Sequence, residues 1–271
     1  MLRAVCVSAI SISLLASAVP AIAEQPLEPV GKWDLDYGET QCGAFRDYGS
    51  AEDPVTLAIR PSPNGDTYEI LVARRSRGPA FAEELRGSVD FGQGPIKAWL
   101  LRYGSASKAL EIYQFRISAA EMAQARSAAS VTLHVTGAPD FAFSLEVIPQ
   151  LLSGLETCTA DLKRYWNMDG EENGRIAKGA RGDVREVFTW GDYPSEALNR
   201  GQEGDAQFLL LIDENGKVAG CHVLIASGVP ALDAMGCSVI RKRARFKPAV
   251  DSAGKPTRST VVTPKVSWRL G

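Results

Sequence analysis

Alternating apolar and polar residues predict a β-rich N-terminal domain over residues 24–166. In Trp33-Asp34-Leu35-Asp36-Tyr37 every second side chain is apolar, as in a half-buried strand. Two further apolar runs flank Asn64-Gly65, a dipeptide typical of a β-hairpin turn. Including that pair, strands are predicted at residues 33–37, 55–59, 68–72, 87–91, 96–103, 110–117, 130–136 and 141–147.

Two helices are predicted within this domain. Ser118 and Glu121 have the spacing of a capping box, which predicts a helix that ends near Ala128. A second helix is expected after Pro149, because proline is favoured in the first helical turn. Apolar residues then recur at helical spacing at Leu151, Leu152, Leu155, Cys158 and Leu162.

The pattern changes after residues 167–189, whose glycines, charges and few large apolar residues predict a linker. Residues 190–271 predict the order helix, strand, strand, helix, strand, with a three-stranded antiparallel sheet. The whole chain is therefore expected to be of the α+β class. The elements are a short helix at Pro194, strands at 208–212 and 218–225 joined by Glu214-Asn215-Gly216, a helix from about Pro230, and a last strand at 259–270.

The first 23 residues have the features of a secretory signal peptide. Arg3 is followed by an apolar stretch at 4–19 and by Ala21-Ile22-Ala23, a small-x-small cleavage site. Cleavage would release a periplasmic protein that begins at Glu24. The alternative is an uncleaved inner-membrane anchor, because the uncharged stretch is about as long as a membrane span.

Four cysteines remain after residue 23, which favours disulfides in an exported chain. Three pairings are possible, and pairing within each domain is the simplest: Cys42 with Cys158, and Cys221 with Cys237. None of them lies in a CxxC motif and the chain has only two histidines, so no metal site is expected.

The sequence contains no recognisable catalytic signature, and we expect neither an enzyme nor a cofactor. His134 is the histidine of a predicted strand, where a lone histidine is usually structural. From residue 190 onward there are 11 Lys and Arg against 8 Asp and Glu, and many of the cations lie in the run 241–247. Such a run can bind nucleic acid, but it also suits the C-terminal end of a helix. The predicted export excludes nucleic acid as a partner.

Several short motifs follow one another in the last 80 or so residues. They are Tyr193-Pro194, Gly204, Asp213-Glu214-Asn215-Gly216-Lys217-Val218, Ser227-Gly228, Leu232-Asp233, Arg245-Phe246-Lys247-Pro248-Ala249 and Gly254-Lys255-Pro256. Together these motifs resemble the C-terminal domain of TonB-type energy transducers over about 190–271.

This resemblance implies a protein partner: the N-terminal segment of an outer-membrane transporter, added as a strand beside the last strand of the sheet. An exposed sheet edge can pair with an extended peptide through main-chain hydrogen bonds. Pro264 fits an edge strand because it has no N–H to donate. An alternative role for Tyr193-Pro194 is to start the helix without contacting a partner. The edge of the sheet at the last strand can also pair with the same edge of a second copy of the chain. The predicted contact residues are Tyr193, Pro194, Ser259, Thr260, Val261, Val262, Thr263, Pro264, Lys265 and Val266.

The chain departs from a complete transducer in two respects. Cleavage of the signal peptide would remove the hydrophobic segment that could serve as a membrane anchor, and a β-rich domain stands where a proline-rich spacer would be expected. The leading interpretation is a periplasmic, non-enzymatic binding protein related to TonB-dependent transport. The alternatives are a complete, membrane-anchored transducer, and an envelope enzyme or ligand-binding protein that acts through the β-rich domain.

Overall fold

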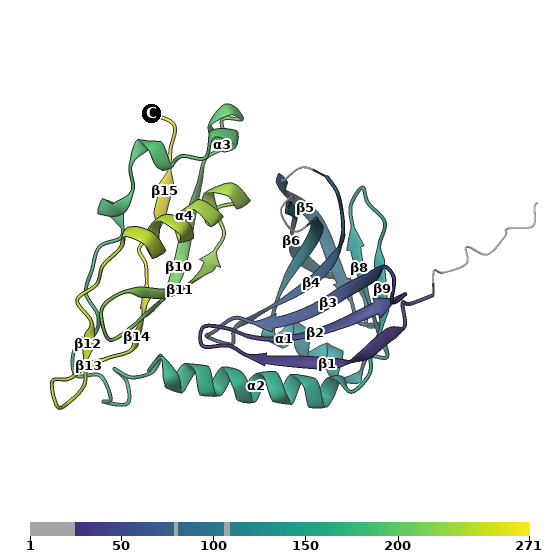
Figure 1. Cartoon of the computed structure of the whole chain (residues 1–271), viewed down its shortest axis with the longest axis horizontal. Coiled ribbons are helices and arrows are strands. Elements are labelled where there is room, and N and C mark those ends of the chain that lie inside the picture. Colours follow the sequence, from purple (N-terminus) through teal and green to yellow (C-terminus); the bar gives the residue numbers. More distant parts are fainter. Residues whose placement is uncertain (1–24, 79–80, 106–108) are drawn as a thin grey trace, which may run out of the picture.

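The computed structural model describes residues 25–78, 81–105 and 109–271 (Figure 1). Two sheets, each with a buried core of its own, form a large N-terminal domain and a small C-terminal domain. The mixture of sheets with a few helices confirms the α+β class. The predicted signal peptide lies outside the described residues, and the exact boundaries of the predicted domains and linker stay a prediction.

The N-terminal domain is a nine-stranded antiparallel sheet that curls until its two ends meet. At the junction the Leu27 N–H donates to Ala142 O at 2.8 Å, and Leu27 O accepts from the Ser144 N–H at 3.0 Å. The strands lie in the order β1-β2-β3-β4-β7-β6-β5-β8-β9. Their bounds are β1 (Pro29–Tyr37), β2 (Cys42–Gly49), β3 (Pro54–Pro61), β4 (Thr67–Arg75), β5 (Phe81–Asp90), β6 (Ile96–Ser105), β7 (Leu110–Ser118), β8 (Ser130–Val135) and β9 (Phe141–Ser144).

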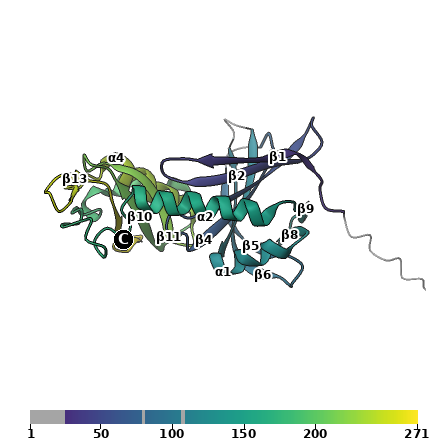
Figure 2. The ribbon, with the colours of Figure 1, turned by 90° about the horizontal axis from the view of Figure 1, so that it is seen from below.

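The helices of this domain begin where the sequence predicts. Ser118 and Glu121 form the capping box of α1 (Ala119–Met122), which continues into the 3-10 helix η1 (Ala123–Ser127). The long helix α2 (Ile148–Tyr165) packs against β1, β2, β3 and η1 and reaches toward the C-terminal domain (Figure 2). Its apolar side chains enter the core as predicted, and Cys158 forms a disulfide with Cys42.

Strand β2 was not predicted, and Arg46 explains why. The inward positions of a half-buried strand are normally apolar, yet Arg46 occupies one of them and is only 8% exposed. Its Nη2 donates to Glu146 Oε2 at 3.0 Å, its Nε donates to Gly31 O at 3.0 Å, and its guanidinium lies over the ring of Tyr48. Partners distant in sequence thus offset the cost of burying this charge.

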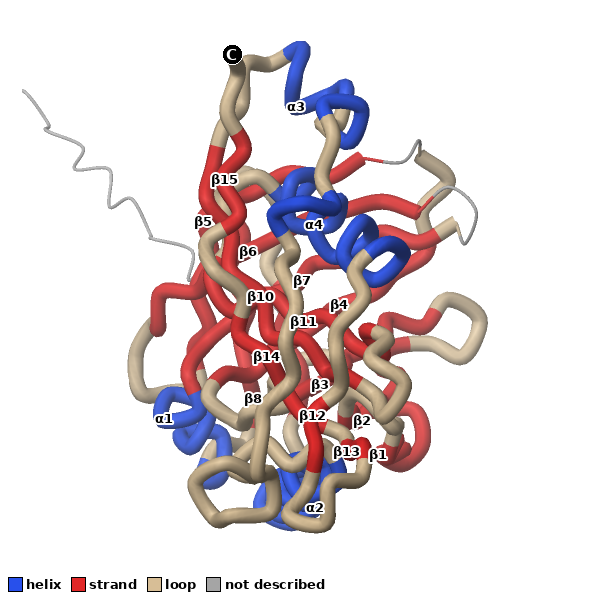
Figure 3. The backbone as a smooth tube through the Cα atoms, turned by 90° about the vertical axis from the view of Figure 1, so that its left-hand side faces the viewer, coloured by secondary structure: helices blue, strands red, loops and turns tan. Residues whose placement is uncertain are grey.

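The C-terminal domain has the predicted order of elements, with additions. A short hairpin, β12–β13, follows α4, and the last strand is divided into β14 and β15 (Figure 3). A disulfide joins Cys221 on β11 to Cys237 on α4, as predicted. The bounds are η3 (Trp190–Asp192), α3 (Ser195–Asn199), β10 (Gly204–Ile212), β11 (Val218–Ile225), α4 (Pro230–Arg243), β12 (Ala249–Val250), β13 (Pro256–Thr257), β14 (Ser259–Val262) and β15 (Val266–Trp268).

Residues 167–189, including the 3-10 helix η2 (Arg185–Val187), follow the surface of the C-terminal domain and are packed against it. The side chains of Ile176 and Val184 are buried. The Arg181 N–H donates to Lys247 O at 3.0 Å, and the Lys247 N–H donates to Arg181 O at 2.8 Å. The path of this segment is therefore fixed by backbone pairing that its own composition does not predict.

We expect replacement of Cys42 and Cys158 by alanine to destabilise the N-terminal domain by about 2–5 kcal/mol, because the bridge joins residues 116 apart and restricts the unfolded chain. Denaturant unfolding of the full chain measures the loss. The matched control replaces Cys221 and Cys237, only 16 apart, and should lower the free energy of unfolding less. If the control lowers the free energy of unfolding as much or more, the length of the loop closed by Cys42 and Cys158 does not determine the stabilisation.

Candidate functional site

Strand β10 is the centre of the C-terminal sheet and is paired on both sides. On one side it pairs with β11, and on the other with β14 and then β15, always antiparallel. Its side chains Phe208, Leu210 and Ile212 are fully buried in the domain core. The two outer edges of this sheet are therefore β11 and the broken strand β14–β15.

The register of β14 determines which of its backbone groups point outward. The Thr263 N–H donates to Phe208 O at 2.9 Å, so this pair is hydrogen-bonded across the ladder. Hydrogen-bonded pairs alternate along an antiparallel ladder. The amides of Val261 and Ser259 consequently face β10, and those of Val262 and Thr260 face away from it. Among the described residues, no strand pairs with this outward side of β14.

Pro264 lies in a one-residue bulge that divides the last strand. Two residues of β10 stand opposite three residues here, because Ala206 pairs with Val266 while Leu209 pairs with Val262. The Thr263 hydroxyl accepts the Phe208 N–H at 3.1 Å and so replaces a lost backbone acceptor. The bulge agrees with the rule that proline occurs at sheet edges and bulges.

A groove of about 510 Å³ runs beside β15, between this strand and residues 185–193. The side chain of Trp190 forms one wall and is 80% exposed. Trp268 of β15 is buried beneath the groove, where Phe188 and Tyr193 pack edge-on against its ring at 5.4 and 5.5 Å between centroids. Three cations line the rim: Arg185, Lys265 and Arg269.

Asp192 holds the Trp190 turn against α4. Its carboxylate accepts two hydrogen bonds from Arg243, at 2.6 and 2.8 Å, and one from the Thr189 N–H at 2.7 Å. Hydrogen bonding to Arg243 lowers the pKa of Asp192 to about 2. The carboxylate is thus ionised throughout the neutral range, and it fixes the wall of the groove.

The predicted contact residues do not all present side chains to a partner. Ser259, Thr263 and Val266 are buried, whereas Val262, Pro264 and Lys265 are exposed. Thr260 and Val261 are half-buried, as are Tyr193 and Pro194. The Tyr193 hydroxyl donates to Gln202 O at 2.5 Å, so it is engaged within the domain. The assignment of these ten residues to a binding site stays a prediction.

Sequence reasoning missed the groove residues Arg185, Phe188, Trp190, Trp268 and Arg269. They lie in the predicted linker, at its end, or beyond the part of the last strand that was assigned to binding. The sequence feature that could have indicated the groove is the pair of aromatic residues around the end of the predicted linker, Phe188 and Trp190, which interrupt an otherwise polar segment.

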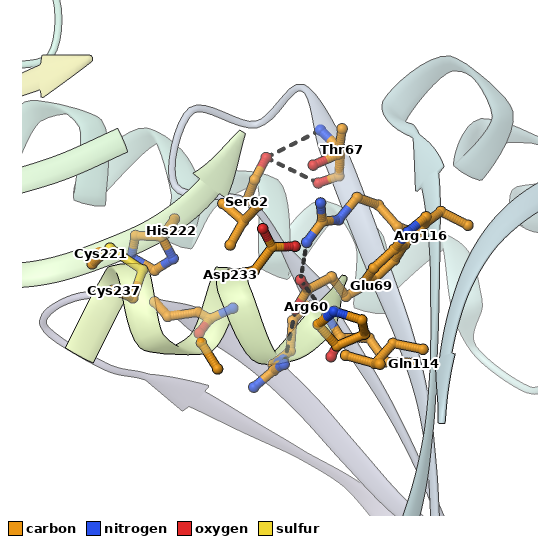
Figure 4. Close-up of a pocket in the computed structure, with 16 residues that line it drawn as sticks. Arg60, Ser62, Thr67, Glu69, Gln114, Arg116, Cys221, His222, Asp233 and Cys237 are labelled. Carbon is orange, nitrogen blue, oxygen red and sulfur yellow. Dashed lines mark hydrogen bonds and ion pairs between the residues drawn. A yellow bond between two sulfur atoms is a disulfide. The ribbon is translucent and has the colours of Figure 1, made fainter. Parts of the chain in front are cut away.

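The other edge of the sheet lies against the N-terminal domain. A cavity of about 270 Å³ separates β11 and α4 from the outer face of β3, β4, β6 and β7 (Figure 4). Arg60 and Arg116 both pair with Glu69 on the N-terminal side, at 2.8 and 3.2 Å. Across the cavity lie His222 of β11 and Asp233 of α4. The N-terminal domain therefore faces the β11 side, and no described strand pairs with the outer side of β11 or of β14–β15.

Burial at this interface lowers the pKa of His222 to about 4. Arg60 and Arg241 act in the same direction, whereas Glu69 and a hydrogen bond to the Thr40 backbone act against it. Burial also raises the pKa of Asp233. The contact between the domains thus favours a neutral imidazole.

Residues 191–270 match the family of the Gram-negative bacterial TonB protein C-terminal. This match confirms the resemblance expected from the ordered motifs, and we refer to the region as the TonB-like domain. A search among curated proteins finds no match to the chain. No helix in the described part of the chain is long and apolar enough to cross a membrane.

We expect the free energy of unfolding to fall by up to about 3 kcal/mol as the pH decreases from about 6.5 toward 4, because the unfolded chain protonates His222 first. Above pH 6.5 this contribution to stability is fully present. Denaturant unfolding across this pH range should show a shallower pH dependence for His222→Gln than for the wild-type chain.

The control is His134→Gln, at the only other histidine of the chain, whose side chain is 43% exposed. This variant retains His222 at the interface and should therefore keep the part of the pH dependence that His222 causes. Asp233 titrates in all three proteins, so the difference between them isolates His222. If His222→Gln and the wild type have equal slopes, the interface does not hold a neutral imidazole.

Proposed function

We propose that the TonB-like domain binds an extended segment of another envelope protein by adding it as a strand to β14–β15. The observation that carries this proposal is the outward N–H and C=O of Thr260 and Val262, on an edge that no described strand covers. Strand addition uses such unpaired groups, which otherwise only water satisfies. The chain belongs in the periplasm after export, where both disulfides would persist.

The groove beside β15 supports the proposal, because it continues the same edge. A guest strand along β14 would reach the groove, where Trp190 offers an exposed ring for a side chain of the guest. Arg185 and Arg269 are paired with Asp183 and Asp205, so it is Lys265, which has no ion pair among the described residues, that favours an acidic residue near this point. Main-chain pairing provides affinity in this mode, and the groove provides specificity.

The partner class that follows from the family is a segment of an outer-membrane transporter, which connects the chain to TonB-dependent transport. The proposed role is binding without catalysis and without a cofactor. The N-terminal domain stands where a transducer has its spacer, so we propose a binding protein and not an energy transducer. If two copies of this chain paired through their β14 edges, they would use the same outward N–H and C=O groups of Thr260 and Val262. Such dimerisation would therefore compete with binding of the guest segment.

Val262→Pro removes one outward N–H and leaves the ladder to β10 intact. We expect it to weaken peptide binding by about tenfold or more, with a change in stability below about 1 kcal/mol. The measurement is calorimetric titration of the full chain with synthetic peptides that cover the N-terminal segments of outer-membrane transporters.

Two neighbouring variants make this test specific. Val262→Ala removes the 53%-exposed side chain but keeps the amide, so it should bind nearly as well as the wild type. Val261→Pro removes an inward amide and should lower the free energy of unfolding by about 3 kcal/mol. Equal binding by Val262→Pro and Val262→Ala would exclude pairing at this edge.

A further inference from the structure

Three segments distant in sequence run side by side beneath α4. Residues 245–247 leave the helix and pair with Arg181 on one side and with Lys217 on the other. The Phe246 N–H donates to Gly216 O at 2.8 Å, while the Lys247 backbone exchanges two hydrogen bonds with Arg181. The chain can approach this closely because residue 216 is glycine, where a Cβ would lie 1.8 Å from Phe246 O.

This pairing places four cations on one exposed face. The Phe246 side chain is buried in the core, so its neighbours Arg245 and Lys247 point to the opposite side. Cross-strand partners share a face, which adds Lys217 beside Arg245 and Arg181 beside Lys247. All four side chains are exposed. We call Arg181, Lys217, Arg245 and Lys247 the basic face.

The arrangement is unfavourable for folding, because like charges directly opposite each other repel. Among the described residues, the charged side-chain nitrogens of these four residues have no carboxylate oxygen within 4.0 Å, although the backbone N–H of Lys217 donates to the Asp213 carboxylate. Arg245 Nη1 donates to the carbonyls of Lys242 and Ala244 at the end of α4, which accounts in part for a cation at position 245. The helix dipole likewise accounts for the cations Arg241 and Lys242 in the last turn of α4. It does not account for the cations Lys217, Lys247 and Arg181, which lie outside the helix.

The basic face is also accessible. In Figure 1 the chain between α4 and β12 lies on the far side of the C-terminal sheet from the N-terminal domain. Adjacent segments are about 4.8 Å apart, so the three segments present a strip about 10 Å wide.

We propose that the basic face binds the anionic headgroup surface of a phospholipid bilayer. A protein partner normally requires a buried apolar or aromatic centre, yet Phe246, the aromatic residue of these segments, points into the core. Long, flexible cations on a flat strip suit a flat surface of many phosphates. This surface is separate from the β14–β15 edge, so the domain can hold a membrane and a guest strand together.

The test is sedimentation of the full chain with vesicles of phosphatidylglycerol and phosphatidylcholine, and with vesicles of phosphatidylcholine alone. The wild type should bind only the anionic vesicles and should be released by about 1 M salt. The variant Arg181→Gln, Lys217→Gln, Arg245→Gln, Lys247→Gln should bind them about 30-fold or more weakly. A control with the same loss of charge is Lys32→Gln, Arg77→Gln, Arg86→Gln, Lys97→Gln, at exposed cations of the N-terminal domain, and should bind like the wild type.

Thermal unfolding provides a second measurement. If the basic face had a purely structural role, replacing one of its cations would lower Tm. Lys247→Gln relieves one like-charge pair and should raise Tm by about 1–4 °C while weakening vesicle binding. The proposal is overturned if the control weakens binding as much as the basic-face variant. It is also overturned if the wild-type chain binds neutral vesicles, or if it binds no vesicles at all. A third contradicting result is tighter binding of the chain to an acidic polypeptide, such as polyglutamate, than to the anionic vesicles.

Discussion

The central constraint on this molecule is that every backbone N–H and C=O of a sheet needs a partner. The small sheet of the TonB-like domain has two edges, and the fold treats them differently. The β11 side lies against the N-terminal domain, across a cavity with the carboxyl groups of Glu69 and Asp233 on its opposite walls. The β14 side keeps the amides of Thr260 and Val262 turned outward. The N-terminal domain faces the β11 edge, so the edge that we propose for a guest strand is the β14 edge, on the other side of the sheet.

The two domains are stabilised in different ways. The curled sheet closes on itself through Leu27 and encloses a large apolar core. The TonB-like domain is smaller and is stabilised by the disulfide between β11 and α4 and by the ion pair of Asp192 with Arg243. That ion pair also fixes the turn that carries Trp190. Stability and the shape of the groove thus depend on the same contact.

Local patterns in the sequence predicted much of the fold. The turn at Asp213 is an example, because its carboxylate accepts the N–H of Asn215 and of Lys217, at 2.9 and 2.8 Å, and Gly216 adopts a positive φ. Such a turn is encoded within five residues and can be identified without a structure. The ordered motifs of the TonB-like domain are local in the same way.

Features that depend on distant partners were not predictable. Strand β2 was missed because Arg46 faces the core, and its carboxylate partner is 100 residues away. Arg60 and Arg116 look like ordinary solvent-facing residues of alternating strands, and only the fold shows that they meet His222. The groove beside β15 depends on the return of residues 185–193 to the last strand, and the basic face depends on two separate β-bridges.

Hydrogen exchange of single backbone amides in the free chain, followed by NMR, tests the open edge most directly. The account predicts slow exchange for Ser259 and Val261, which face β10, and fast exchange for Thr260 and Val262, which face solvent. Equally slow exchange at all four amides would show that the outward side of β14 is already covered. In that case no edge is free to receive a guest strand.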